Sequence, residues 1–307
     1  MPPRSPLPQR QGLDAAWLRT PDNDPEALAR WVTMGDFLLD RLPAAAPVAE
    51  MLRAGEFVDR SGHPWNGEEA YRPNEFVWFH RSLAPEPVVP FAVEVLEVDA
   101  RVVVVDKPHF LATTPRGTHV RESVLVRLRG SLGLSDLAPA HRLDRLTAGV
   151  LVLTSHREHR AAYAGVFQTR SVHKTYEALA RFDPTLDFPR RVTNRIEKRR
   201  GSLQAEVVAG EPNAETLVEL VETRGRHARY RLTPSTGKTH QLRVQMAALG
   251  LPILGDPLYP AVLDLEADDF TTPLQLIARR LSFTDPIDQA PRDYTSGFAL
   301  DWTVVAR

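Results

Sequence analysis

The stretch "HRLDRLTAGVLVLT", residues 141–154, places a charged cluster directly before an apolar run. Asp144 lies between Arg142 and Arg145, and "GVLVLT" has the pattern of a buried strand. A carboxylate at the entrance of such a strand must either be neutralised by a partner or be used for chemistry. A structural salt bridge and a functional carboxylate both fit this local pattern, so the rest of the chain has to decide between them.

The composition excludes several classes of protein. With 307 residues and 43% hydrophobic side chains, the chain can bury one large core and a smaller one. It has no cysteine, which excludes disulfides, a thiolate zinc site and a cysteine nucleophile. No apolar stretch reaches the ~18 residues of a membrane span, and "MPPRSPLPQRQG" lacks the apolar core of a secretion signal. We therefore expect a cytoplasmic protein with no membrane partner.

Charge is distributed unevenly along the chain. The formal net charge is −1, but residues 1–100 hold 9 Lys/Arg against 16 Asp/Glu, whereas residues 101–307 hold 29 against 23. The basic character is therefore concentrated in the second part, and the weak overall charge does not exclude a nucleic-acid partner.

The pattern of apolar residues and turns predicts two folded parts after a tail. Residues 1–24 are Pro-rich and are predicted to be a disordered tail. Residues 25–83 are predicted to form a small α+β module with one or two helices in 25–53, and "LAPEPVVP" resembles a linker. Residues 84–307 form the main domain. Its predicted strands and few helices indicate the α+β class, with strands at 91–108 (a hairpin), 147–155, 173–182, 227–234, 274–286 and 298–306, and helices at 157–170 and 237–250.

Two tempting motifs are incomplete. "TPSTGKTH", residues 233–240, ends like a phosphate-binding loop, but Leu232 stands where that motif requires a glycine. His156 and His159 have no H-E-x-x-H pattern or acidic cluster beside them, which argues against a metal site. Nucleotide hydrolysis and metal catalysis are therefore not supported.

A basic run follows the third predicted strand. "PRRVTNRIEKRR", residues 189–200, holds six basic side chains against one acidic side chain and contains few apolar anchors. A solvated face is the simple explanation, but an arm that lies along a phosphate backbone fits better. The predicted RNA-contacting residues of this run are Arg190, Arg191, Arg195, Lys198, Arg199 and Arg200.

Beyond these local patterns, "HRLDRLTAGVLVLT" resembles the signature H-R-L-D-x-x-T-S-G-L of the RluA-type pseudouridine synthases. Four further stretches resemble motifs of that family in the family's order: "DKPHFLATTP" (106–115), "HKTYEAL" (173–179), "TGKTHQLRVQMAALGLPILGDPLYP" (236–260) and "LQLIARRLSFTDP" (274–286). Together they extend over about 200 residues. The chain is therefore identified as a divergent member of this family.

The resemblance implies a mixed, largely antiparallel sheet with a central RNA-binding cleft. It implies an RNA pseudouridine synthase, an isomerase that converts a uridine within RNA to pseudouridine without a metal or organic cofactor. No obligatory protein partner follows from it, and we expect a monomer. By match to the signature, Asp144 is the nucleophile, which attacks either the sugar or the uracil ring.

The resemblance also assigns the residues around Asp144. Arg243 matches the salt-bridge partner of the nucleophile, and Tyr176 matches a tyrosine that stacks on uracil and helps to move a proton. Arg142 is similar to an arginine that fills the space left by the flipped nucleotide. Further RNA contacts are expected from Arg145, Lys174, Lys238 and His240. Ile253 and Leu254 form either an apolar wall of the uracil pocket or ordinary core, and Asp256 is expected to hold a turn.

Some positions depart from the family pattern. Ala148 replaces a serine, Gln245 and Ile277 replace histidines, and "KPHF" lacks a glycine. The N-terminal module faintly resembles a small RNA-binding module but is acidic. These departures leave the target uridine open, with ribosomal RNA favoured over transfer RNA. A non-catalytic RNA-binding or ribosome-assembly factor and a nucleoside hydrolase remain alternatives, although the hydrolase requires a second carboxylate that the matched motifs lack.

Overall fold

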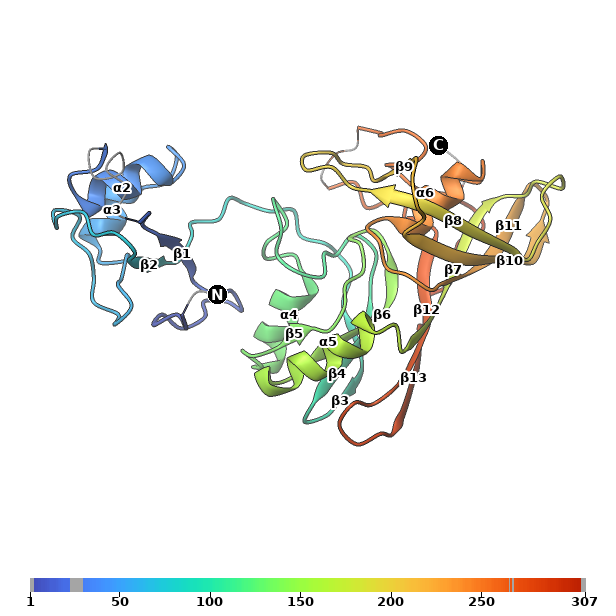
Figure 1. Ribbon diagram of the computed structural model, residues 1–307, viewed down its shortest axis with the longest axis horizontal. Helices are drawn as coiled ribbons and strands as arrows, with labels where there is room; N and C mark the ends of the chain where they lie inside the picture. Colours follow the sequence, from blue (N-terminus) through green and yellow to red (C-terminus); the bar gives the residue numbers. More distant parts are fainter. Residues whose placement is uncertain (1–2, 23–29, 265, 267, 305–307) are drawn as a thin grey trace. The chain divides into compact units, whose positions relative to one another are not determined.

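The computed structural model describes residues 3–22, 30–264, 266 and 268–304. The chain divides into two compact units, Met1–Pro85 and Glu86–Arg307 (Figure 1). We call them the N-terminal unit and the C-terminal unit. The predicted boundary, after residue 83, lies two residues before this division. Residues 23–29, which include the predicted start of a helix at residue 25, lie outside the described residues.

The N-terminal unit packs two helices on a two-stranded sheet. Strand β1 (Ala16–Arg19) pairs antiparallel with β2 (Phe76–Phe79), and helices α2 (Met34–Arg41) and α3 (Val48–Arg53) lie between them in the sequence. Ala16 and Leu18 alternate with exposed residues along β1 and pack against the buried core of this unit. The predicted disordered tail is therefore wrong for β1, because the two inward side chains join that core.

The C-terminal unit is built on one large sheet. Its eleven strands follow the order β3-β4-β6-β12-β7-β11-β10-β8-β9, with β13 beside β12 and β5 beside β6. Among the described strands, only β6 and β12 pair in parallel. The strands are β3 (Glu94–Val98), β4 (Val102–Lys107), β5 (Ala138–Pro139), β6 (Ala148–Thr154), β7 (Val172–Arg181), β8 (Arg190–Glu197), β9 (Glu206–Val208), β10 (Ala214–Arg224), β11 (His227–Pro234), β12 (Leu276–Thr284) and β13 (Pro291–Thr295).

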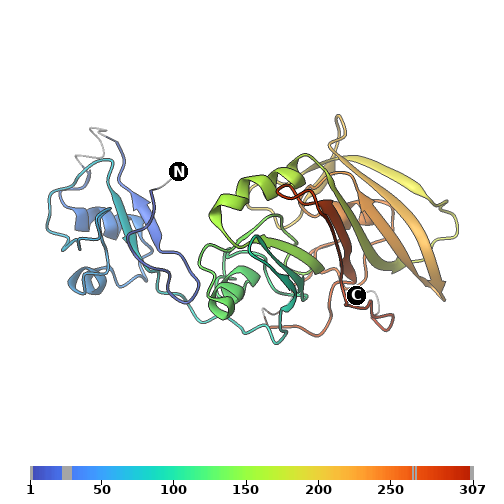
Figure 2. The ribbon, with the colours of Figure 1, turned by 90° about the horizontal axis from the view of Figure 1, so that it is seen from below.

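Helices cover both faces of the sheet at β4 and β6. The helices of this unit are α4 (Val124–Leu132), the short 3₁₀ helix η1 (Arg157–His159), α5 (Arg160–Gln168) and α6 (Gln241–Ala248). In Figure 2 the helices α4 and α5 lie on opposite sides of these strands. Val103 and Val105 pack in the same core as α4, whereas Val102 and Val104 pack with Tyr163 of α5. Because both faces of the sheet are buried here, the sequences of β4 and β6 are continuous apolar runs rather than alternating patterns.

One predicted strand does not form within the described part of the chain. The predicted strand at 298–306 does not form over its described residues, and β13 (Pro291–Thr295) closes the sheet instead. The aromatic and β-branched residues that suggested a strand contain Asp301, whose side chain accepts hydrogen bonds from Thr303 and so favours a turn. Within the basic run at 189–200, Arg190–Glu197 forms strand β8 between β10 and β9.

Candidate active site

Asp144 lies in the loop that leads into β6. Its side chain is 32% exposed, whereas every residue of β6 is buried. Thr113 holds the residue before it, since its hydroxyl donates to the carbonyl of Leu143 (2.8 Å) and accepts from the amide of Leu143 (3.2 Å). The nucleophile candidate is therefore presented by a short loop with fixed backbone.

Lys107 also fixes the loop that contains Asp144. Its fully buried ammonium donates to the carbonyl oxygens of Pro108 (2.9 Å), Leu111 (2.8 Å) and Arg145 (3.2 Å). Burial lowers the pKa of Lys107 to about 7, and the negative charge of Asp144 opposes this shift. Next to it, His109 Nδ1 donates to the carbonyl of Leu146 (2.7 Å). The "DKPHF" turn thus supports the part of the loop that follows Asp144, a role that its sequence did not indicate.

Arg243 lies between two carboxylates. It projects from α6 with a side chain only 2% exposed, and its Nη1 is 3.7 Å from Asp144 Oδ2. Its other side makes two hydrogen bonds to Asp256, from Nε (2.8 Å) and Nη2 (2.6 Å). Burial lowers the pKa of Arg243, but the hydrogen bonds and charge of Asp256, together with Asp144, outweigh this effect and raise it overall. The predicted pairing with Asp144 is present, yet the closer partner is Asp256.

Asp256 is saturated by these contacts. Its side chain is fully buried, and Oδ1 also accepts hydrogen bonds from the amides of Leu258 (2.8 Å) and Tyr259 (3.2 Å). It therefore holds a turn, as the sequence predicted, and at the same time orients Arg243 toward Asp144. Asp144 is left as the carboxylate of this cluster that can reach a substrate.

Tyr176 projects from β7, opposite Leu232 of β11 and Ala278 of β12. It packs against the main core, and burial followed by the charge of Asp144 raises its pKa. Its hydroxyl is therefore protonated near neutral pH, and its ring forms an apolar wall close to Asp144.

Tyr259 contacts Ala205 as well as two residues at α6, His240 and Arg243. Its hydroxyl donates to the carbonyl of Ala205 (2.9 Å) and accepts from the amide of Ala205 (2.7 Å), and it lies 3.0 Å from His240 Nδ1. The guanidinium of Arg243 lies over its ring at 5.3 Å. Sequence reasoning did not single out this tyrosine. The signal was its position three residues after Asp256 in "GDPLY", where one turn brings both side chains to Arg243.

The predicted RNA-binding residues near Asp144 differ in their surroundings. Arg142 is exposed, and Arg145 is half-buried, so that burial and then the charge of Arg243 lower its pKa. Lys198 follows β8. Burial and the charge of Arg116 lower its pKa, whereas the charge of Asp144 raises it. Lys198 therefore lies close enough to Asp144 to interact with its charge. Lys238 is exposed before α6.

The other predicted contacts are half-buried or buried. Lys174 is half-buried on β7, where burial and then Arg170 lower its pKa. Ile253 and Leu254 are 3% and 2% exposed, and Ile253 belongs to the main core. Core packing therefore accounts for these two residues.

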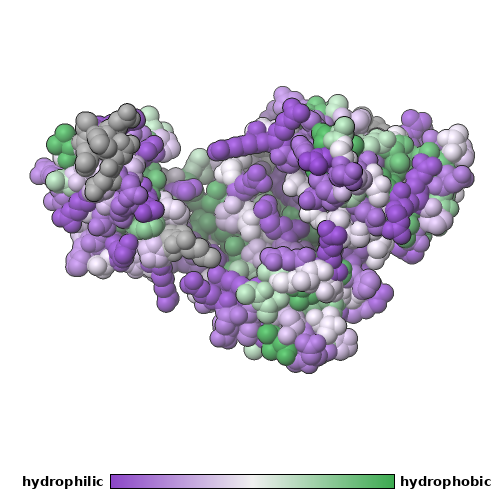
Figure 3. All heavy atoms as spheres, viewed as in Figure 1, coloured by the Kyte–Doolittle hydropathy of each residue, from purple (hydrophilic) through white to green (hydrophobic). Residues whose placement is uncertain are grey.

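The basic run divides into two halves. In β8, Arg191 pairs with Glu215 and Arg195 with Glu197, and Arg190 lies at the far end of the strand. After β8, Lys198, Arg199 and Arg200 are exposed. Because a strand rises about 3.3 Å per residue, the two ends of β8 lie roughly 20 Å apart. Hydrophilic side chains surround a recess of this unit between the part with α6 and β8 and the part with α4 and α5 (Figure 3).

The structure explains the departures from the family pattern. Ala148 and Ile277 are direct partners in the parallel β6–β12 pairing, and both are fully buried. Two polar positions of the family pattern thus meet here as an apolar pair. Gln245 is buried, and its amide hydrogen-bonds Thr216, Asn194 and the carbonyl of Val192.

No group of three or more metal-ligating side chains exists within the described residues. Across the described ranges, no helix is long and apolar enough to span a membrane.

Comparisons with known proteins agree with this geometry. The sequence model of the family described as RNA pseudouridylate synthase matches residues 101–248. The dual-specificity RNA pseudouridine synthase RluA of Vibrio parahaemolyticus is 32% identical over 219 residues, which cover 65% of this chain and 80% of that protein. The RluA of Yersinia pestis is 31% identical over 207 residues, 62% of this chain and 92% of that protein.

Solved structures resemble the same part of the chain. Human RNA pseudouridylate synthase domain containing 1 superposes with a TM-score of 0.56 at 21% identity, covering 70% of this chain and 86% of that chain. Human RNA pseudouridylate synthase domain containing 4 gives 0.53 at 26% identity, covering 68% and 89%. The fold of the C-terminal unit is thus the one predicted.

Proposed function

The chain belongs to the RluA family of RNA pseudouridine synthases, and from that premise we propose that Asp144 is the nucleophile that isomerises specific uridines in structured RNA. Within the cluster around Arg243, Asp144 is the carboxylate that remains partly exposed, 3.7 Å from a buried guanidinium. This observation carries the proposal, because a nucleophile needs both access to substrate and a charge that keeps it ionised.

The single free carboxylate also argues against hydrolysis. Hydrolases of glycosidic bonds use two carboxyl groups that flank the bond. Asp256 is the other carboxylate of this cluster, and its oxygens are occupied by Arg243 and two backbone amides. Isomerisation, in which the base stays in the site and rejoins the sugar, fits this arrangement better than release of uracil.

Arg142 is proposed to stabilise the flipped state of the RNA. A uridine stacked in RNA is out of reach of Asp144, and flipping it costs a few kcal/mol. The side chain of Arg142 is exposed two residues before Asp144. A planar guanidinium at this place can stack where the base was and offset part of that cost. Arg145, Lys198, Lys238 and the exposed Arg199 and Arg200 would contact phosphates.

The activity is tested by tritium release from C5 of labelled uridine in RNA. Wild type should release tritium, and Asp144→Asn should not. Free uracil as product would favour a hydrolase, and absence of release from any RNA fraction would contradict the catalytic role of Asp144 and favour a binding factor.

The RNA class is proposed to be ribosomal, with transfer RNA as the second candidate. Both relatives described above are named dual-specificity enzymes, so the assay must offer both classes separately. Mapping pseudouridines in cells with and without this protein identifies the modified position. A site in transfer RNA alone would contradict the preference for ribosomal RNA.

A further inference from the structure

Formation of pseudouridine requires a base that removes the hydrogen on C5. When C5 of uracil has bonded to C1′ of the sugar, C5 still carries its hydrogen and N1=C6 is a double bond. Removal of the C5 proton lets the C–H electron pair form C5=C6, while the N1=C6 electrons move to N1, which takes up a proton. Some group must accept the C5 proton, and that group needs an accessible lone pair at neutral pH.

Most polar groups of the site cannot accept it. Burial and the charge of Asp144 raise the pKa of Tyr176, so this hydroxyl does not ionise near neutral pH. Asp256 is fully buried and saturated by hydrogen bonds. Lys107 is fully buried beneath the loop with its ammonium on three carbonyl oxygens.

His240 has the required properties. It is half-buried and is the N-cap residue of α6, three residues before Arg243. Tyr259 contacts both residues: its hydroxyl is 3.0 Å from His240 Nδ1, and its ring lies beneath the guanidinium of Arg243. His240 therefore belongs to the same cluster as Asp144.

The hydrogen bonds of Tyr259 fix the tautomer of His240. The single hydroxyl proton of Tyr259 is donated to the carbonyl of Ala205, and its oxygen accepts from the amide of Ala205. His240 Nδ1 must then be the donor in its contact with Tyr259, so that the lone pair of the neutral ring lies on Nε2. No hydrogen bond to Nε2 is made by the described residues, and this atom is not among their buried polar atoms without partners.

The backbone of His240 is strained. Its φ of 56° lies in the left-handed region, which non-glycine residues seldom adopt. Such strain concentrates at functional sites, where the surrounding structure holds it in place. The groups that face the imidazole are Asp144, Arg243, Lys198, Asp256 and Tyr259, and burial is the main cause that lowers the pKa of His240. The ring is therefore neutral near pH 7.

We propose that His240 is the general base that removes the C5 proton, accepting it on Nε2 and then releasing it to water or to N1. This inference rests on the proposed function of Asp144 and adds the proton acceptor that the reaction needs. Release to water also accounts for loss of a C5 label to solvent. The phenol of Tyr259 is a positioning group, because it holds the imidazole in the tautomer that leaves Nε2 free.

The test compares single-turnover rates on RNA with hydrogen or deuterium at C5 of uridine. His240→Gln should slow the reaction by about 10²- to 10⁴-fold, leave the RNA dissociation constant within about twofold of wild type, and show a larger C5 isotope effect than wild type. Tyr259→Phe should slow the reaction less. His227→Gln, at the turn between β10 and β11 and away from this cluster, serves as the matched control and should behave as wild type.

The isotope effect separates a base from a structural or binding residue. A slower reaction with an unchanged isotope effect, an unchanged rate, or a change confined to RNA affinity would overturn the proposal. If thermal melting shows that His240→Gln is misfolded, His240→Gly replaces it, because glycine adopts this φ without strain. Failure of Asp144 as nucleophile is recognised separately, since Asp144→Asn would then retain tritium release.

Discussion

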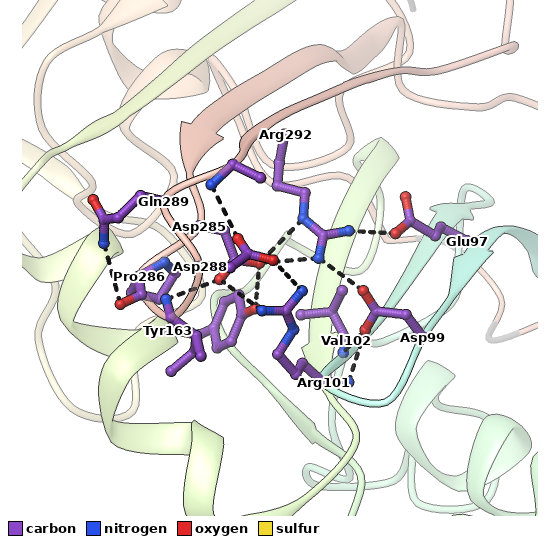
Figure 4. A network of polar contacts seen from close by, with 12 residues as sticks. Glu97, Asp99, Arg101, Val102, Tyr163, Asp285, Pro286, Asp288, Gln289 and Arg292 are labelled. Carbon is purple, nitrogen blue, oxygen red and sulfur yellow. Dashed lines mark hydrogen bonds and ion pairs between the residues drawn. The ribbon is translucent and has the colours of Figure 1, made fainter.

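Two clusters of the C-terminal unit each place an arginine beside a carboxylate, and they differ in how completely that carboxylate is paired. Asp285 is fully buried and accepts hydrogen bonds from Tyr163 (2.7 Å), the amide of Ile287 (2.9 Å) and Arg292 (3.1 Å) (Figure 4). Asp144 is 32% exposed and has one ion-pair partner at 3.7 Å. No described group donates a hydrogen bond to its side chain.

The partners of Arg292 and Arg243 show the same difference in pairing. Arg292 also pairs with Asp99 and Glu97, and Arg101 pairs with Asp285 and Asp288, so the cluster joins β3, the β3–β4 turn, β13 and the loop before it. Among the carboxylates of the described residues, Arg243 hydrogen-bonds Asp256 and leaves Nη1 facing Asp144. A saturated carboxylate stabilises a fold, whereas a carboxylate that is held but not saturated is available to a substrate.

The largest expected effect follows from Asp144→Asn. Its reaction rate should fall by roughly 10⁴-fold or more, because the nucleophile is lost. Its free energy of unfolding should change by about 1 kcal/mol or less, because the Asp144 side of the pair is partly exposed and Arg243 keeps Asp256. Tritium release and urea unfolding measure the two quantities. A large loss of stability would show that Asp144 is a structural ion, like Asp285.

The second effect concerns Asp256→Asn. This change leaves the buried guanidinium of Arg243 without its close carboxylate and should lower the free energy of unfolding by about 3 to 5 kcal/mol. The rate should fall as well, because Arg243 loses the group that orients it toward Asp144. Chemical unfolding and the assay at a temperature where the variant is folded give both numbers. Normal activity in the folded variant would contradict the orienting role.

The third effect concerns Asp285→Asn, the matched change in the saturated cluster. We expect a smaller loss of stability, about 2 to 3 kcal/mol, because Arg292 retains Asp99 and Glu97. The rate of the folded variant should equal that of wild type. A fall in rate at full folding would mean that this cluster is coupled to the site.

The dependence of the unfolding free energy on acid pH should also reflect the cluster around Asp285. Burial raises the pKa of Asp285, but hydrogen bonds from Tyr163, Ile287 and Arg292 outweigh this effect and lower it overall. A lowered pKa in the folded state contributes stability above the unfolded value of about 3.9, and this contribution is lost as the pH falls through the folded pKa. Below about pH 4 the unfolding free energy of wild type should therefore fall more steeply with acid than that of Asp285→Asn. Asp99 and Asp288, whose pKa values are also lowered, keep the slope of the variant above zero.

The sequence predicted the functional cluster better than the structural one. The motif around Asp144 and the later Q-L-R segment predicted that Arg243 and Asp144 would meet, and the apolar run predicted β6. The bidentate contact with Asp256 depends on a turn that buries this carboxylate beside α6, and no spacing in the sequence encodes that burial. The cluster around Asp285 draws on residues from Glu97 to Arg292 whose meeting depends on the order of the strands.

Contacts between positions that are distant in the sequence could not be predicted from the sequence either. Ala148 and Ile277 were separate departures in the sequence, and only the parallel register of β6 and β12 makes them one apolar contact. The predicted strand at 298–306 illustrates the opposite error. Its composition favoured a strand, but β12 already pairs with β13, β6 and β7, and the segment after β13 is instead tied to Asp106 through Ser296 and Gly297.

The smallest expected effect concerns the basic run at 189–200, where paired and unpaired arginines can be compared in the same way. Arg199 and Arg200 are exposed and have no carboxylate partner within the described chain, whereas Arg191 and Arg195 of β8 are paired with Glu215 and Glu197. If unpaired charge marks function here as well, Arg199→Ala with Arg200→Ala should weaken RNA binding several-fold. The slope of log affinity against log salt should then fall by about 0.7 to 0.9 for each phosphate that the variant no longer neutralises.

Arg191→Ala combined with Glu215→Gln is the matched control, because it removes a charge of the same run together with the carboxylate that neutralises it. Its affinity and salt slope should stay close to those of wild type, since an exposed ion pair leaves little field for a distant phosphate. Filter binding over a range of salt concentrations measures both variants. An equal effect of the two changes would mean that the run acts through its total charge, and that pairing does not separate structural from functional arginines on this surface.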